Sequence, residues 1–141
     1  MPHAEIAALI PHQGGMCLLE DVVEWADSRI VLTTSTHRSM DNPLRVDGKL
    51  RAVHSCEYGA QAMAVHGALK AAPNRAPPGM LVSLRSVTFA REYIHDLAGV
   101  LRIDAVCLQA TESSQQYSFK ITHDEQIVAE GRAAVLLTQP S

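Results

Sequence analysis

The chain has 141 residues, of which 47% are hydrophobic and 19% charged. This composition predicts one domain, residues 1–141, that buries roughly two-thirds of its unfolded surface. A net charge of −3 excludes the broad basic surface that nonspecific nucleic-acid binding requires. Three cysteines without a C-x-x-C pair predict neither a disulfide framework nor a structural zinc site. No apolar run approaches the roughly 20 residues of a membrane span, and the first residues do not resemble a secretion signal, so we expect a cytoplasmic protein.

The first fifty residues predict a short helix, a hairpin and a loop. Residues 3–10 place Ile6, Leu9 and Ile10 on one helical face, and the proline and glycines that follow end this helix. Two apolar, β-branched runs at 17–25 and 29–37 predict an antiparallel hairpin. Residues 38–50 hold Pro, Gly, Asp and Asn without periodicity, which is typical of a loop.

Residues 51–72 predict the one long helix of the chain. They contain no proline, and apolar residues recur at helical spacing, namely Val53, Cys56, Ala60, Met63, Ala64, Gly67 and Ala71. Many of the side chains are small, so a sheet can approach the helix axis closely. We therefore expect this apolar stripe to face the sheet.

Four strand-like runs follow, at 80–90, 100–110, 115–123 and 126–137. The connections between them are too short for parallel crossovers. An α+β fold satisfies this order: an antiparallel six-stranded sheet wrapped around one long central helix, which is the hotdog architecture. Such a sheet has open edges, and pairing between two copies would close them, so we expect a dimer.

Glu57 is the first candidate for chemistry. It falls in the apolar stripe of the long helix, one turn before Gln61, so both side chains are expected to face the sheet or a neighbouring subunit. A carboxyl group that loses hydration holds its proton more readily and can donate it at neutral pH. The alternative is a glutamate at the margin of the stripe, solvated or paired with an arginine.

Two histidines are candidate proton carriers. His12 lies in the turn IPHQGGM and His54 shares a helical face with Glu57. Alternatively, His12 caps the carbonyls of the first helix. No third ligand accompanies His54 and Glu57 at a metal-binding spacing, so no metal site is predicted. Ser55 and Cys56 have no recognisable base, which disfavours covalent catalysis, and no glycine-rich loop predicts a nucleotide cofactor.

Several arginines and a lysine could form a local basic patch for an acidic carrier protein or a phosphopantetheine phosphate. They are Arg45, Lys49 and Arg51 before the helix, and Arg85 and Arg91 around a strand. Scattered, solvated charge is the alternative interpretation for each of them.

Two segments resemble the hotdog 3-hydroxyacyl-carrier-protein dehydratases of fatty acid synthesis. IPHQGGMCLLEDVVEW resembles their leading L-P-H-R-x-P-M-L-L-x-D-x-V segment, and CEYGAQAMA resembles their central-helix E-A-M-A-Q-x-x-A segment. The strand GMLVSLRSVTF and the closing QIVAEGRAAVLL also resemble theirs, so the similarity covers nearly the whole chain. Within this superfamily, E-Y-x-A-Q looks most like the aryl-polyene-pathway dehydratases, the ApeP-like branch.

The resemblance implies dehydration of a 3-hydroxyacyl thioester to a trans-2-enoyl thioester. The acyl group would be carried on the phosphopantetheine of an acyl carrier protein, with no other cofactor. Glu57 matches the family's acid, and the first helical turn, around Val53, Ser55 and Cys56, would supply backbone N–H groups to the thioester oxygen. The resemblance also implies a substrate tunnel between two subunits, with Gly59, Ala60 and Gln61 beside the acyl chain.

One departure from the family concerns the base. The histidine of the family's G-H-F-P-G loop falls on Pro43 here, so this residue is absent. His12, which matches a motif position, becomes the candidate base, with His54 as the alternative. Two other functions stay open: an acyl-binding, catalytically weak subunit that completes a heterodimer with a related dehydratase, and a hotdog acyl thioesterase in which Glu57 activates water.

Overall fold

The computed structural model describes residues 6, 17–71 and 79–137. Ile6 is fully buried in the core. The rest of the predicted helix 3–10, and the turn that contains His12, lie outside the described residues, so these two predictions stay open.

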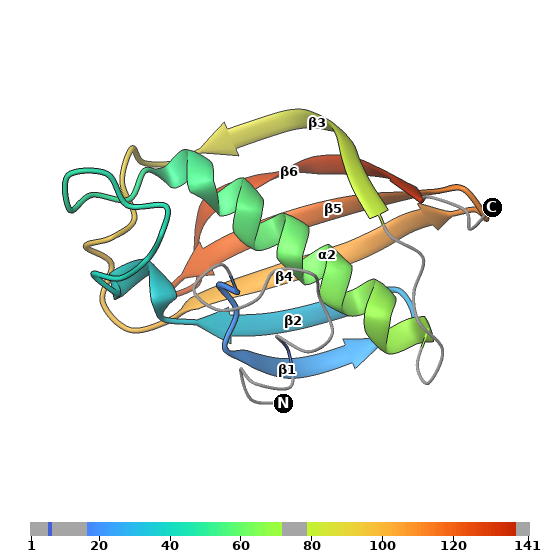
Figure 1. Cartoon of the computed structure of the whole chain (residues 1–141), viewed down its shortest axis with the longest axis horizontal. Coiled ribbons are helices and arrows are strands. Elements are labelled where there is room, and N and C mark those ends of the chain that lie inside the picture. Colours follow the sequence, from blue (N-terminus) through green and yellow to red (C-terminus); the bar gives the residue numbers. More distant parts are fainter. Residues whose placement is uncertain (1–5, 7–16, 72–78, 138–141) are drawn as a thin grey trace.

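Six strands form one sheet in the order β1-β2-β4-β5-β6-β3, and every neighbouring pair is antiparallel (Figure 1). The strands are β1 (Asp21–Ala26), β2 (Arg29–Thr34), β3 (Gly79–Phe89), β4 (Leu101–Ala110), β5 (Ser114–His123) and β6 (Gln126–Leu137). The predicted hairpin is β1 and β2, and all four later strand predictions are confirmed. Short connections account for the pairs β1–β2, β4–β5 and β5–β6, because they return the chain antiparallel to the strand it has just left. The pairs β2–β4 and β3–β6 join strands that are distant in the sequence.

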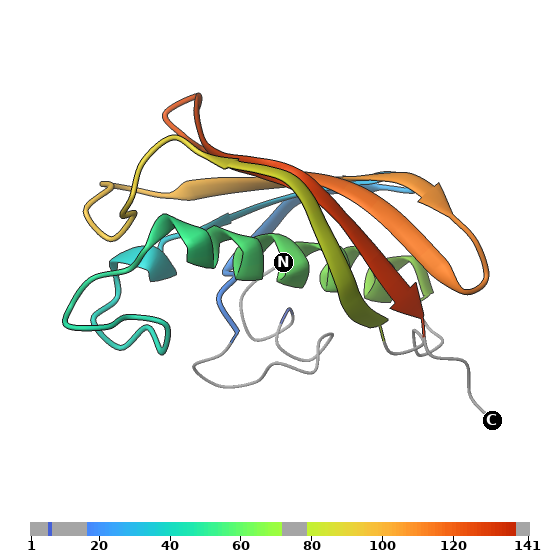
Figure 2. The same ribbon diagram turned by 90° about the horizontal axis from the view of Figure 1, so that it is seen from above.

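The long helix is also confirmed. A 3-10 turn, η3 (Ala52–His54), runs directly into α2 (Ser55–Ala71), close to the predicted bounds of 51–72. Viewed from above, the sheet curves over α2, which lies along its concave face (Figure 2). The chain therefore has the hotdog fold, with α2 in contact with β2, β4 and β5.

Alternating residues of the central strands form the core under the helix. Leu101, Ile103 and Ala105 of β4 are fully buried, while the residues between them are not. Tyr117, Phe119 and Ile121 of β5 repeat this alternation. Because successive side chains of a strand point to opposite faces, each strand presents one apolar row to α2.

The face of α2 that meets the sheet differs in part from the predicted one. Val53 is 51% exposed, and Cys56, Ala60, Ala64 and Gly67 are only half-buried. Met63 and Gln61 are buried as predicted. The other buried residues of the helix are Ser55, Tyr58, Gly59, Ala62, Val65 and His66. The predicted stripe followed small apolar residues, whereas the helix also turns Tyr58 and His66 inward, where each side chain finds a hydrogen-bond partner.

Candidate active site

Glu57 and Gln61 lie one helical turn apart and are joined by a hydrogen bond. The Gln61 amide donates to Glu57 Oε1 across 3.2 Å, and its own oxygen accepts the backbone N–H of Leu18 across 2.9 Å. Leu18 N–H can only donate, so the Gln61 amide has one orientation, with its NH₂ toward Glu57. Gln61 is fully buried and Glu57 half-buried, which places the carboxyl group at the boundary of the core.

Leu18 is held on its carbonyl side as well. Its oxygen accepts the hydroxyl of Thr34 and the hydroxyl of Thr36, each across 2.6 Å. The carboxylate of Glu20 accepts the backbone N–H and the hydroxyl of Ser35. These two hydrogen bonds also hold residues 17–20 against the residues that follow β2. Residues 17–20, which follow the IPHQGG motif in the sequence, are thereby held beside Gln61.

The loop at 38–50 folds back onto the helix through Asn42. Its amide nitrogen donates to the Tyr58 hydroxyl (3.1 Å) and to the Thr36 carbonyl (3.0 Å), while its oxygen accepts the Leu44 N–H. Asn42 is buried, whereas its neighbour Pro43 is exposed. The loop at 38–50 thus contacts the helix through an amide, a group that does not titrate.

His54 and Ser55 occupy the predicted first turn. His54 is half-buried, and the N–H groups of His54 and Ser55 already donate to carbonyls of the 3-10 turn. Of the four backbone donors predicted at 53–56, these two are therefore used within the protein. Ser55 is fully buried, and its hydroxyl has no hydrogen-bond partner among the described residues. Burial also raises the pKa of the Cys56 thiol, which keeps it protonated and disfavours a nucleophilic role.

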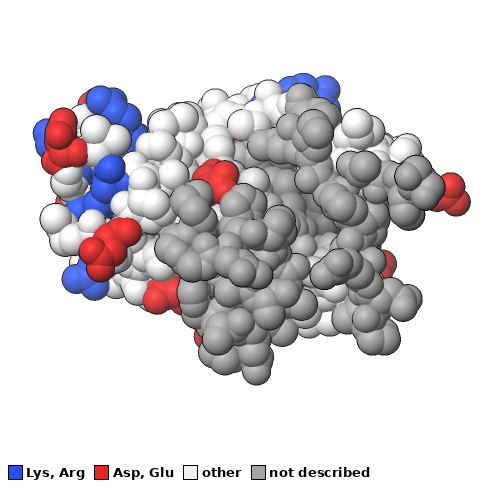
Figure 3. Space-filling model, in the orientation of Figure 1, with Lys and Arg blue, Asp and Glu red and all other residues white. Residues whose placement is uncertain are grey.

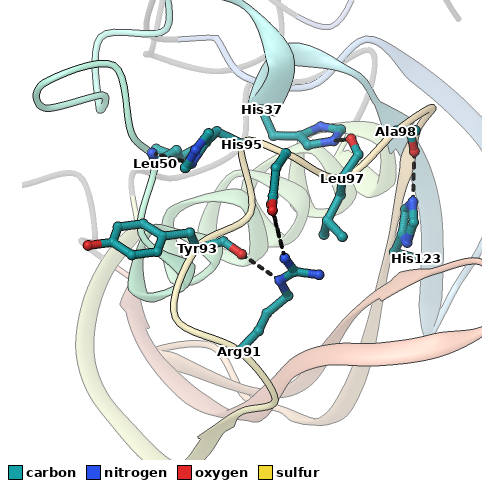
Figure 4. Close-up of polar contacts among 9 residues, drawn as sticks. His37, Leu50, Arg91, Tyr93, His95, Leu97, Ala98 and His123 are labelled. Atoms are coloured by element: carbon teal, nitrogen blue, oxygen red, sulfur yellow. Dashed lines mark hydrogen bonds and ion pairs between the residues drawn. The ribbon is translucent and has the colours of Figure 1, made fainter.

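The connection between β3 and β4 supports the start of the helix. Ala52 N–H donates to the Glu92 carbonyl, and Ile94 N–H donates to the Leu50 carbonyl. Three histidines from different elements fasten this connection (Figure 4). His37 donates to the Leu97 carbonyl, His123 donates to the Ala98 carbonyl, and His95 accepts the Leu50 N–H.

Charged side chains gather at the end of the molecule where the loop before α2 and the β3–β4 connection lie (Figure 3). Most of the predicted basic patch is paired internally. Arg51 contacts Glu92 (3.3 Å), Arg91 contacts Asp96 (3.0 Å), and Arg45 donates to two backbone carbonyls. Lys49 and Arg51 also flank the ring of Tyr93, at 5.5 and 5.4 Å from its centre. Local pairing therefore accounts for much of this charge.

The described residues hold neither a metal cluster nor a membrane-spanning helix. No group of three or more His, Cys, Asp or Glu side chains there could hold a metal ion. No helix of the described ranges is long and apolar enough to cross a bilayer.

Comparison with known proteins decides the family. The model of the ApeP-like family, described as ApeP dehydratase, matches residues 4–141. The chain belongs to the ApeP-like dehydratase family. No curated protein sequence matches the chain.

Solved structures share the fold of this family member. The dehydratase heterocomplex ApeI:P from Xenorhabdus doucetiae matches with a TM-score of 0.84 and 23% identity, over 99% of this chain and 92% of that one. A hypothetical thioesterase from Streptococcus pneumoniae TIGR4, solved with coenzyme A, matches with a TM-score of 0.61 and 16% identity, over 86% and 88% of the two chains. A homologue of HP0420 from Helicobacter felis gives 0.68 and 14%, over 99% and 92%. These structural similarities establish the hotdog fold, and the family model establishes the dehydratase family.

The geometry brings together only some of the residues predicted from sequence. Glu57 and Gln61 are bonded to each other, with Ser55, Cys56 and Gly59 on adjacent helical positions. The supporting residues Leu18, Thr34, Thr36, Asn42 and Tyr58 were not predicted. Tyr58 is the one that a sequence signal could have revealed, because it stands inside the E-Y-x-A-Q motif.

Proposed function

We propose that this protein dehydrates 3-hydroxyacyl thioesters carried on an acyl carrier protein, giving trans-2-enoyl thioesters. The observation that carries this proposal is the Glu57 carboxyl group, half-buried on the central helix and oriented by the buried amide of Gln61. Membership of the ApeP-like dehydratase family supports the reaction class. The 3-hydroxyacyl substrate and the acyl carrier protein go beyond this membership and are part of the proposal.

The reaction needs an acid and a base on one substrate. A base removes the C2 proton, the C3–O bond breaks, and an acid protonates the departing hydroxyl so that it leaves as water while the C2=C3 bond forms. Glu57 is the proposed acid. The Gln61 amide donates to Glu57 Oε1 and so fixes the orientation of this carboxyl group. The positive end of α2 favours the charge that develops on the thioester oxygen.

His12 is the proposed base. It stands six residues before Leu18 in the sequence, and the N–H of Leu18 is bonded to Gln61, the partner of Glu57. His54 remains the alternative base, one turn before Glu57 at the start of the helix.

A second candidate function is the acyl-binding half of a heterodimer. The loop at 38–50 has Pro43 at the histidine position and contacts the helix through Asn42. The ApeI:P structure is a heterocomplex of dehydratases. In this case a related dehydratase would supply the base, and the tunnel would form between the two different subunits. A homodimer is the corresponding expectation for an enzyme that acts alone.

The substitution Glu57→Gln tests the proposal, because the amide keeps the volume of the side chain but cannot supply a proton. Dehydration of a 3-hydroxyacyl carrier-protein thioester should fall about a hundredfold or more. Glu130→Gln, on an exposed position of β6, is the matched control and should keep wild-type turnover. Both variants are assayed alone and with a partner dehydratase, and the products are resolved by mass.

Near-normal turnover of Glu57→Gln would remove Glu57 from the acid role. Wild-type activity that appears only with the partner, and survives Glu57→Gln, would favour the acyl-binding subunit. Release of free acid from the thioester, without loss of water, would assign the chain to the thioesterases instead.

A further inference from the structure

We propose that Tyr58 is a positioning residue for Glu57, acting through Thr36, Leu18 and Gln61. This inference rests on the proposed function, since it concerns the placement of the proposed acid. Tyr58 itself is fully buried against the sheet side of α2, on the helical position next to Glu57. Its hydroxyl contacts Thr36 Oγ1 (2.9 Å) and Asn42 Nδ2 (3.1 Å), so it connects the loop at 38–50 to the 3-10 turn Thr36–Arg38 that follows β2.

The direction of each hydrogen bond in this connection follows from the chemistry of its ends. The Leu18 carbonyl can only accept, so Thr36 donates its single hydroxyl proton to it. Thr36 must then accept from Tyr58, and Tyr58 accepts from the Asn42 amide. The Asn42 amide is itself oriented, because its oxygen accepts the Leu44 N–H. The chain of donors therefore runs one way, from Asn42 to the Leu18 carbonyl.

Leu18 transmits the effect of Tyr58 to Glu57, the proposed acid. Leu18 is held by its carbonyl on one side and by its N–H on the other, where it fixes the Gln61 oxygen at 2.9 Å. Gln61 then presents its NH₂ to Glu57 Oε1. Loss of the Tyr58 hydroxyl removes one contact of Thr36 and frees its hydroxyl to turn away from Leu18. The Thr34 hydroxyl, which also contacts Thr36, then remains as the second donor to the Leu18 carbonyl, so Leu18 is loosened rather than released. A displaced Leu18 shifts Gln61 and, with it, Glu57. The side chains that contact substrate keep their chemical identity, and only their placement changes.

The helix supplies a matched control. Tyr117 of β5 is also fully buried, and its hydroxyl bonds His66 Nδ1 across 2.7 Å. His66 stands nine positions beyond Glu57 along α2, about 13 Å at the rise of a helix, and it belongs to none of the contacts that hold Leu18. Tyr58→Phe and Tyr117→Phe therefore remove the same atom from equally buried rings, and only the first lies in the chain of donors that reaches Glu57.

The experiment compares four variants by steady-state dehydration and by hydrogen exchange of the Leu18 amide. Tyr58→Phe and Thr36→Val should lower kcat about tenfold, with KM within about twofold, because the acid is misplaced while binding is kept. Both should also speed exchange at Leu18. Thr36→Ser, which keeps the hydroxyl, should recover most of kcat. Tyr117→Phe should keep wild-type kcat and wild-type protection of Leu18.

Equal losses of kcat in Tyr58→Phe and Tyr117→Phe would overturn the proposal in favour of a general effect on stability. Unchanged kcat in both Tyr58→Phe and Thr36→Val would overturn it too, whatever the exchange at Leu18. Wild-type protein that does not dehydrate the thioester, alone or with a partner, contradicts the proposed function itself. These results separate a wrong positioning residue from a wrong reaction.

Discussion

Gly59 and Gly67 share one helix but differ in their surroundings. A Cβ on Gly59 would lie 2.9 Å from Cδ2 of Phe119, whose ring is buried at 2% exposure and cannot move aside. A Cβ on Gly67 would meet no described atom within 4 Å. Small size was predicted to let the sheet approach the helix closely. The structure confirms this for Gly59 and gives no such reason for Gly67.

Alanine at these two positions should therefore change stability in opposite directions. Gly59→Ala should lower the free energy of unfolding by about 1–3 kcal/mol, because it overpacks the contact between helix and sheet. Gly67→Ala should raise it by up to about 1 kcal/mol through helix propensity. Urea unfolding followed by circular dichroism measures both. A stabilised Gly59→Ala protein would mean that the sheet withdraws from α2 at little cost.

At the scale of elements, the sequence predicts the strands and the helix but only part of the buried side of the helix, namely Gln61 and Met63. The strand prediction succeeds because alternating rows such as Leu101, Ile103 and Ala105 are a local pattern. The rest of the helix face fails because Tyr58 and His66 are polar, yet they are buried with hydrogen-bond partners far away in the chain. Hydrophobic periodicity does not record such partners.

In the candidate site, too, the sequence predicts contacts between nearby residues but not contacts between distant ones. The pair Glu57 and Gln61 is visible in sequence because a four-residue offset brings side chains together on any helix. Leu18 and Thr36 could not be predicted, since Leu18 meets Gln61 across 43 positions and Thr36 meets Tyr58 across 22. The histidines that fasten the β3–β4 connection were missed for the same reason, because each bonds a backbone group of a distant segment.

At the scale of the whole molecule, two buried histidines link folding to pH. His66 donates from Nε2 to the Ala26 carbonyl (2.8 Å), and in the neutral ring its Nδ1 accepts the Tyr117 hydroxyl. His37 donates from Nε2 to the Leu97 carbonyl, and its Nδ1 is buried without a partner among the described residues. Burial lowers the pKa of both histidines below the ordinary 6.5.

We therefore expect stability to fall as the pH drops below about 6.5. There the unfolded chain protonates both histidines while the folded protein holds them neutral, so the unfolded state binds more protons. Each histidine contributes up to about 1.4 kcal/mol of lost unfolding free energy per pH unit, until its folded pKa is reached. His66→Gln keeps a donor for Ala26 and an acceptor for Tyr117 but does not titrate, so it should reduce the slope by about half. Urea unfolding at pH 7.5, 6.5 and 5.5 measures these slopes, and an unchanged slope in His66→Gln would show that the acid sensitivity arises elsewhere.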